Sequence, residues 1–78
     1  MTITEKIDII EEVADAVGGE IRDDYSGRGM YGKTCIGVVA DNAHEVIEEA
    51  AERGLRGAVT DNMGLQYIVY WPGVSRDA

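Results

Sequence analysis

Two stretches of the chain carry apolar residues at helical spacing, and each is followed by segments with the composition of β-strands. The first apolar stripe consists of Ile3, Ile7, Ile10, Val13, Ala14 and Val17. The second consists of Ala43, Val46, Ile47, Ala50 and Ala51. Acidic residues occupy the opposite arc of both stretches. This pattern predicts two amphipathic helices, each of which buries one side against a second layer.

Residues with capping preferences stand at the ends of both predicted helices. Thr2 and Glu5 have the spacing of a capping box, which satisfies backbone amides in the first turn of a helix. Gly18 follows the first stripe and is suited to end that helix. Asp41–Asn42 offers N-caps for the second helix, and Gly54 is placed to close it. We therefore expect the first helix to span about residues 3–17.

Four segments have strand character. Residues 20–25 are polar and suit an edge strand, because charges there discourage unwanted pairing. Residues 34–40 are apolar and β-branched on both faces, which favours a central strand. Residues 57–60 form a short strand, a turn follows at 61–64, and residues 65–71 have the strongest strand composition of all. The fold class is therefore α+β, in the order α-β-β-α-β-β: a small, mostly antiparallel sheet of three to four strands with both helices on one face.

The chain length of 78 residues predicts a single domain, 1–78, in which residues 74–78 form a frayed tail. Its single cysteine, Cys35, excludes an intramolecular disulfide, and with one histidine, His44, it falls short of the usual four-ligand zinc site. No apolar run approaches the roughly 20 residues of a membrane span. Acids interrupt the N-terminal segment early, unlike a signal peptide. We expect a cytoplasmic protein without a metal.

The formal net charge of −8 argues against nucleic acid and anionic membranes as direct partners, and it favours a basic protein partner. Two simpler explanations of the acidity stay open. Negative charge keeps a small protein soluble, and a salt-adapted host selects for acidic surfaces.

Gly27–Thr34 matches the P-loop pattern, and its glycines also match the dinucleotide and kinase patterns. A P-loop needs a helix after the loop, because the helix N-terminus helps to cradle the phosphates. Here the loop leads into the strand-like segment 34–40. We therefore expect no nucleotide cofactor.

The sequence has no convincing catalytic arrangement. His44 falls on the polar margin of the second helix, and Cys35 lies within a strand and has the character of a small core residue. Ser26 and Thr60 have no evident histidine partner. We expect a binding protein rather than an enzyme.

The glycine-rich loop is one candidate partner-binding segment. Tyr25, Arg28, Tyr31 and Lys33, together with Met30, form a local basic and aromatic cluster in an acidic chain. Aromatic residues, Met and Arg are the types that anchor protein interfaces. The alternative is a plain connection whose tyrosines fold back onto the core.

The acidic side of the two helices is the other candidate. These acids are Glu5, Asp8, Glu11, Glu12, Asp15, Glu45, Glu48, Glu49 and Glu52. If both helices cover one sheet face, the carboxylates form a continuous negative surface that can imitate the phosphates of DNA. Within it we assign partner binding to Glu12, Asp15, Glu45, Glu48, Glu49 and Glu52. The alternative is two ordinary solvated helices.

The run Asp23–Cys35, together with Ile68–Pro72, resembles small proteins of tailed phages and prophages, over residues 22–73. Small acidic phage proteins of this kind include anti-CRISPR inhibitors, some of which cover the DNA-binding surface of a type I CRISPR surveillance complex. The resemblance therefore implies a phage- or mobile-element-encoded inhibitor of a nucleic-acid-binding host complex.

A second hypothesis is a structural or accessory homodimer without an inhibitory role. Alternation along 65–71 places Tyr67, Val69 and Trp71 on one side of the strand and Ile68 and Tyr70 on the other. With both helices on one face, one of these sets is left exposed, and an exposed apolar face favours self-association. This hypothesis uses the face that carries Tyr67 and Trp71.

Overall fold

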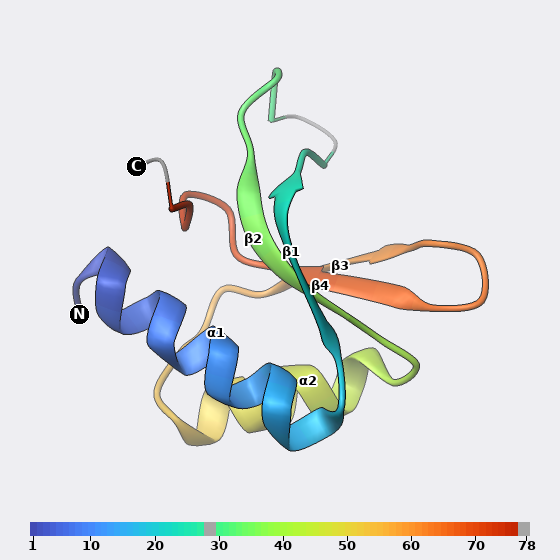
Figure 1. Ribbon diagram of the computed structural model, residues 1–78, viewed down its shortest axis with the longest axis horizontal. Helices are drawn as coiled ribbons and strands as arrows, with labels where there is room; N and C mark the ends of the chain where they lie inside the picture. The colour runs from blue at the N-terminus through green and yellow to red at the C-terminus, as the bar shows by residue number, and fades with distance from the viewer. Residues whose placement is uncertain (28–29, 77–78) are drawn as a thin grey trace.

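The polypeptide runs twice through a helix followed by a β-hairpin (Figure 1). The computed structural model describes residues 1–27 and 30–76. Its elements are α1 (Ile3–Val17), β1 (Glu20–Tyr25), β2 (Cys35–Ala40), α2 (Ala43–Glu52), β3 (Val59–Asn62) and β4 (Tyr67–Tyr70). The strands form one antiparallel sheet in the order β1-β2-β4-β3. The predicted α+β class and element order are therefore confirmed, with β1 at an edge and β2 in the centre.

Both helices begin where the capping residues predict. The Thr2 hydroxyl accepts a hydrogen bond from the Glu5 amide at 3.1 Å, and the Glu5 carboxylate accepts one from the Thr2 amide at 3.0 Å. Gly18 ends α1 in the left-handed conformation at φ 68°, which a residue without Cβ adopts at little cost. The Asn42 side chain accepts from the Glu45 amide at 3.2 Å and caps α2.

The main core lies between the helices and one face of the sheet. It contains Ile7, Ile10, Val13, Ala14, Ile36, Val38, Ala40, Val46, Ala50, Leu55, Val69, Trp71 and Val74. Trp71 is 2% exposed, so the expectation that it belongs to an open sheet face is wrong. Ile47, predicted as part of the apolar stripe of α2, is 36% exposed. The buried residues of α2 are Val46 and Ala50.

The opposite face of the sheet carries a second, smaller core of Cys35, Val39, Ile68 and Tyr70. The hairpins β1–β2 and β3–β4 run in different directions (Figure 1), and Tyr25 and Met30 pack against this face. Both sides of β4 are therefore covered over residues 68–70. Tyr67, at the start of the strand, is 41% exposed.

The β3–β4 hairpin is displaced by two residues from its predicted position. β3 extends to Asn62, and the turn occupies residues 63–66, where the Met63 amide donates to the Gln66 carbonyl at 2.8 Å. The Asn62 side chain accepts from the Gly64 amide at 2.8 Å and stabilises the turn.

The C-terminal segment packs against the body of the protein, so the prediction of a frayed tail is wrong at its start. Val74 is 3% exposed and Ser75 is 8% exposed. The Val74 carbonyl accepts a hydrogen bond from the Ile36 amide at 2.8 Å, and Arg76 contacts Asp23 at 2.6 Å. A turn after Trp71 brings the chain back along β2. Residues 77–78 lie outside the described part of the chain.

Candidate functional site

The helices carry the main acidic surface of the protein. α1 and α2 pack beside one another and cover the same sheet face (Figure 1). The nine acids predicted for this surface are exposed, with the exception of the half-buried Glu49. Lys6 is the only lysine or arginine within the two helices. We call these nine residues the acidic helix surface.

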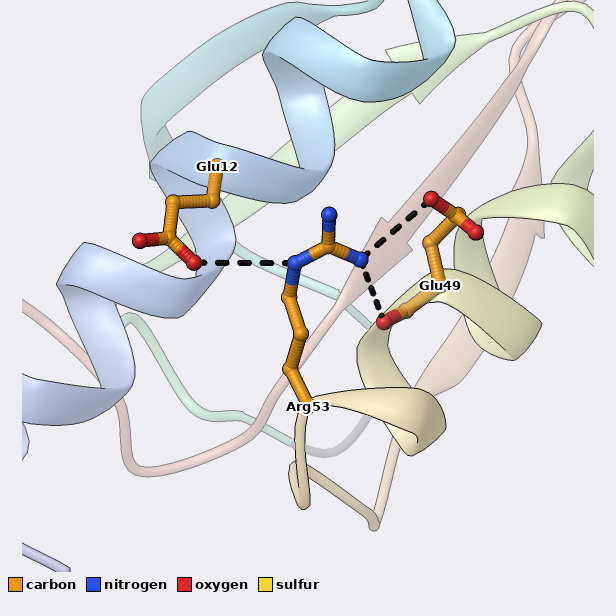
Figure 2. Close-up of polar contacts among 3 residues, drawn as sticks. All are labelled: Glu12, Glu49 and Arg53. Carbon is orange, nitrogen blue, oxygen red and sulfur yellow. Dashed lines mark hydrogen bonds and ion pairs between the residues drawn. The ribbon is translucent and has the colours of Figure 1, made fainter.

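Arg53 joins the two helices across this surface (Figure 2). Its Nε lies 3.5 Å from Oε2 of Glu12. Its Nη1 lies 3.3 Å from Oε1 of Glu49 and donates to the Glu49 carbonyl at 2.9 Å. The i,i+4 spacing of Glu49 and Arg53 therefore produces an ion pair, and the guanidinium partly neutralises two predicted binding residues.

The other carboxylates assigned to partner binding have few intramolecular partners. Asp15, Glu45 and Glu52 make no ion pair among the described residues. Glu48 lies 2.8 Å from Nε2 of His44, and both side chains are mainly exposed. The carboxylates of Asp15, Glu45 and Glu52 are therefore available to an external cation.

Replacing Arg53 with methionine should lower the free energy of unfolding by about 1 kcal/mol, because Glu12 and Glu49 lose a shared counterion on a partly exposed site. Arg56→Met is the matched control, since Arg56 is exposed and makes no ion pair in the described structure. Urea denaturation in low and in 1 M salt measures the difference. A loss for Arg53→Met that equals the control, or that is unchanged by salt, would contradict the bridging role.

Some residues of the glycine-rich loop fit the plain connection and others fit the recognition loop. Tyr25 and Met30 turn toward the small core, as the plain connection predicts. Tyr31 is 96% exposed and Lys33 is exposed, as a recognition loop requires. Arg28, the fourth predicted binding residue of the loop, lies outside the described residues. The loop leads into strand β2, so the P-loop match lacks the helix that would complete a phosphate site.

A β-bulge in β1 determines where Tyr25 points. Arg22 pairs with Gly37, but Tyr25 pairs with Cys35, so β1 contains one extra residue in this interval. The bulge places Tyr25, rather than Asp24, on the face opposite the helices. There the Tyr25 ring lies 4.8 Å from the Tyr70 ring, with planes inclined at 47°.

Asp61, on the far edge strand β3, completes this cluster. Its carboxylate accepts a hydrogen bond from the Tyr25 hydroxyl, and this bond connects the two edge strands β1 and β3 across the sheet face. Tyr25, Ser26, Gly27, Asp61 and Asn62 line an open cleft of about 530 Å³. We call it the tyrosine–aspartate cleft. Sequence reasoning missed Asp61, and its position in a predicted turn gave no signal of this contact.

Burial, followed by the hydrogen bond to Asp61 and the negative charge of that carboxylate, raises the pKa of Tyr25 to about 12. Burial also raises the pKa of Tyr70, and the negative charge of Asp61 is the second largest cause of this increase. Both phenols therefore stay protonated at neutral pH, and Tyr25 acts as the donor to the carboxylate.

The raised pKa of Tyr25 predicts alkaline destabilisation. The contribution of the protonated phenol to stability is complete below the usual pKa of 10.0 and is lost as pH rises toward about 12, because the unfolded chain releases the proton first. The difference in stability between the wild type and Tyr25→Phe should therefore shrink between pH 10 and pH 12. Denaturant titrations across this range measure it. A constant difference would contradict the buried, hydrogen-bonded phenol.

The structure gives little support to metal or nucleophile chemistry. Among the described residues, no group of three or more His, Cys, Asp and Glu side chains is arranged to hold a metal ion. Burial raises the pKa of the Cys35 thiol, which disfavours the reactive thiolate. His44 is 80% exposed and contacts only Glu48 among the charged residues described. No helix in the described ranges is both long and apolar enough to cross a bilayer.

Comparison with protein-family models, with curated proteins and with solved structures finds no match to this chain.

Proposed function

We propose that this protein is an inhibitor that binds the basic, nucleic-acid-binding surface of a host complex through the acidic helix surface. The observation that carries the proposal is the packing of α1 beside α2 on one sheet face, which collects nine carboxylates against a single lysine within the helices. Arg53 holds the two helices together and leaves the outer carboxylates available.

The chemistry of this surface suits competition with DNA. A row of exposed carboxylates on rigid helices offers fixed negative charge to lysines and arginines that otherwise contact phosphates. Association between such surfaces is fast and weakens as salt screens the charges, over a length of about 10 Å at 0.1 M salt. The resemblance to phage proteins supports a type I CRISPR surveillance complex, in the cytoplasm of the host, as the partner.

Capture from a nuclease-treated lysate of a host that contains this complex tests the proposal. The tagged protein should retain the surveillance complex in low salt and release it as salt rises. Recovery of the bait alone, or retention that is unchanged in 1 M salt, would contradict electrostatic binding through the helices.

An accessory homodimer is the second candidate, and exposed apolar residues of the β3–β4 hairpin favour it. Leu65 is 99% exposed, and Met63 and Tyr67 are 39% and 41% exposed. Trp71 takes no part, because it is buried. Light scattering at high micromolar concentration decides this point: a strictly monomeric particle would eliminate the homodimer and leave the inhibitor proposal unaffected.

A further inference from the structure

We propose that the tyrosine–aspartate cleft binds an arginine side chain of a partner protein. This site lies on the sheet face opposite the helices, and the inference does not depend on the acidic helix surface. It follows from three features of the cleft: an oriented carboxylate, an aromatic wall and a close-fitting backbone.

The carboxylate of Asp61 is held in place but not saturated. Oδ2 accepts the Tyr25 hydroxyl, and the Tyr70 hydroxyl also hydrogen-bonds to this carboxylate. An ionised carboxylate offers about four lone-pair directions, so acceptor capacity remains. Asp61 is only half-buried and lines the open cleft, where a cation from outside the molecule reaches it.

The aromatic wall is the ring of Tyr25. The ring of the buried Tyr70, which is 4% exposed, packs against the Tyr25 ring at a centroid distance of 4.8 Å. Tyr25 itself is half-buried, so part of its surface faces the cleft. A ring held in one orientation beside a carboxylate suits a flat cation, which stacks on the ring while its N–H groups reach the oxygens.

Gly27 allows the backbone to close one side of the cleft. A Cβ atom at this position would lie 2.6 Å from the Tyr70 hydroxyl oxygen and 3.2 Å from Cε2 of Tyr25. Only a glycine therefore brings the loop this close to both rings. The cleft is thus built from a loop and an edge strand that are far apart in the sequence, with backbone and side chains in mutual contact.

These features select a guanidinium among the common ligand chemistries. The negative charge of Asp61 and the net charge of −8 disfavour an anion. An apolar ligand would cover the carboxylate without providing a counterion or a hydrogen-bond donor. A guanidinium is planar and carries a fork of N–H donors, whereas an ammonium lacks the flat surface that stacks on a ring. An arginine on a basic partner therefore fits the cleft best.

The test is a titration of the isotope-labelled protein with the peptide amide Gly-Arg-Gly, followed by amide chemical shifts. Gly-citrulline-Gly is the control peptide, because citrulline has nearly the same shape and no charge. We expect saturable shifts at Tyr25, Gly27, Asp61 and Asn62, with a dissociation constant on the order of 1 mM for one side chain. Equal binding of the citrulline peptide, or shifts confined to the helices, would overturn the proposal.

Asp61→Asn should weaken binding of the arginine peptide by at least about tenfold, since it keeps the shape of the side chain and removes its charge. Glu20→Gln on β1, an exposed position outside the acidic helix surface, is the matched control, with the same change in net charge and an expected effect below about twofold. Circular dichroism checks that both variants are folded. Equal affinities of the two variants would overturn the proposal, and neither result bears on binding through the acidic helix surface.

Discussion

Replacing Trp71 with alanine should lower the free energy of unfolding by about 3–5 kcal/mol, because it empties the largest side-chain volume of the main core. Trp71 is 2% exposed and packs among residues from both helices and the central strands. A domain of 78 residues has a total stability of only about 4–12 kcal/mol, so the variant should be largely unfolded near physiological temperature. Urea denaturation followed by far-ultraviolet circular dichroism measures the loss.

Leu65→Ala is the control for this prediction. Leu65 is 99% exposed at the tip of the β3–β4 hairpin, so its truncation should change stability by less than about 0.5 kcal/mol. Trp71→Phe adds a finer comparison. The buried indole nitrogen of Trp71 has no hydrogen-bond partner in the described structure, so phenylalanine sacrifices volume but no hydrogen bond. Equal stability of Trp71→Ala and Leu65→Ala would contradict the core described above.

Reversing the charge of Glu45 and Glu52 together should weaken binding to a basic partner by about 100-fold at low salt, since two attractive contacts become repulsive. Both side chains are exposed and make no ion pair among the described residues, so the folded state loses little. They lie two turns apart on α2, beside Glu48. Surface-binding measurements with the purified partner should show most of the loss in the association rate, and the loss should diminish as salt rises.

The matched control reverses Glu20 and Asp24 on the edge strand β1. Both residues are exposed, and the double reversal changes the net charge by the same amount. Asp24 makes only an exposed contact of 3.5 Å with Arg22, which contributes little stability. If the two double variants lose the same affinity, binding depends on overall charge and not on the acidic helix surface.

The helices and their ends were predictable from sequence because their signals are local. Apolar spacing and the Thr2–Glu5 capping box define α1, and the glycine at 18 ends it in the observed conformation. The N-cap of α2 was also predictable, because Asn42 is a preferred capping residue and directly precedes the apolar stripe. The order of elements along the chain followed from the alternation of helical and β-branched segments, whereas the pairing of β2 with β4, which are not consecutive strands, was not predicted.

The features that sequence missed depend on contacts between distant segments. Burial of Val74 requires the chain to turn back beside Ile36, which no local pattern indicates. The contact of Tyr25 with Asp61 depends on the bulge in β1 and on the different directions of the two hairpins. The pairing of Glu12 with Arg53 needs α1 and α2 to be side by side. Partner binding by Tyr31, Lys33 and the acidic residues stays a prediction.

Competition with DNA tests the central claim most directly. A purified type I CRISPR surveillance complex is incubated with labelled target DNA and increasing amounts of this protein, and bound DNA is followed by mobility shift. The account predicts that the wild type displaces DNA at low salt and that the variant with Glu45 and Glu52 reversed requires about 100-fold more protein. Unchanged DNA binding, or a complex that holds the protein and DNA together, would contradict it.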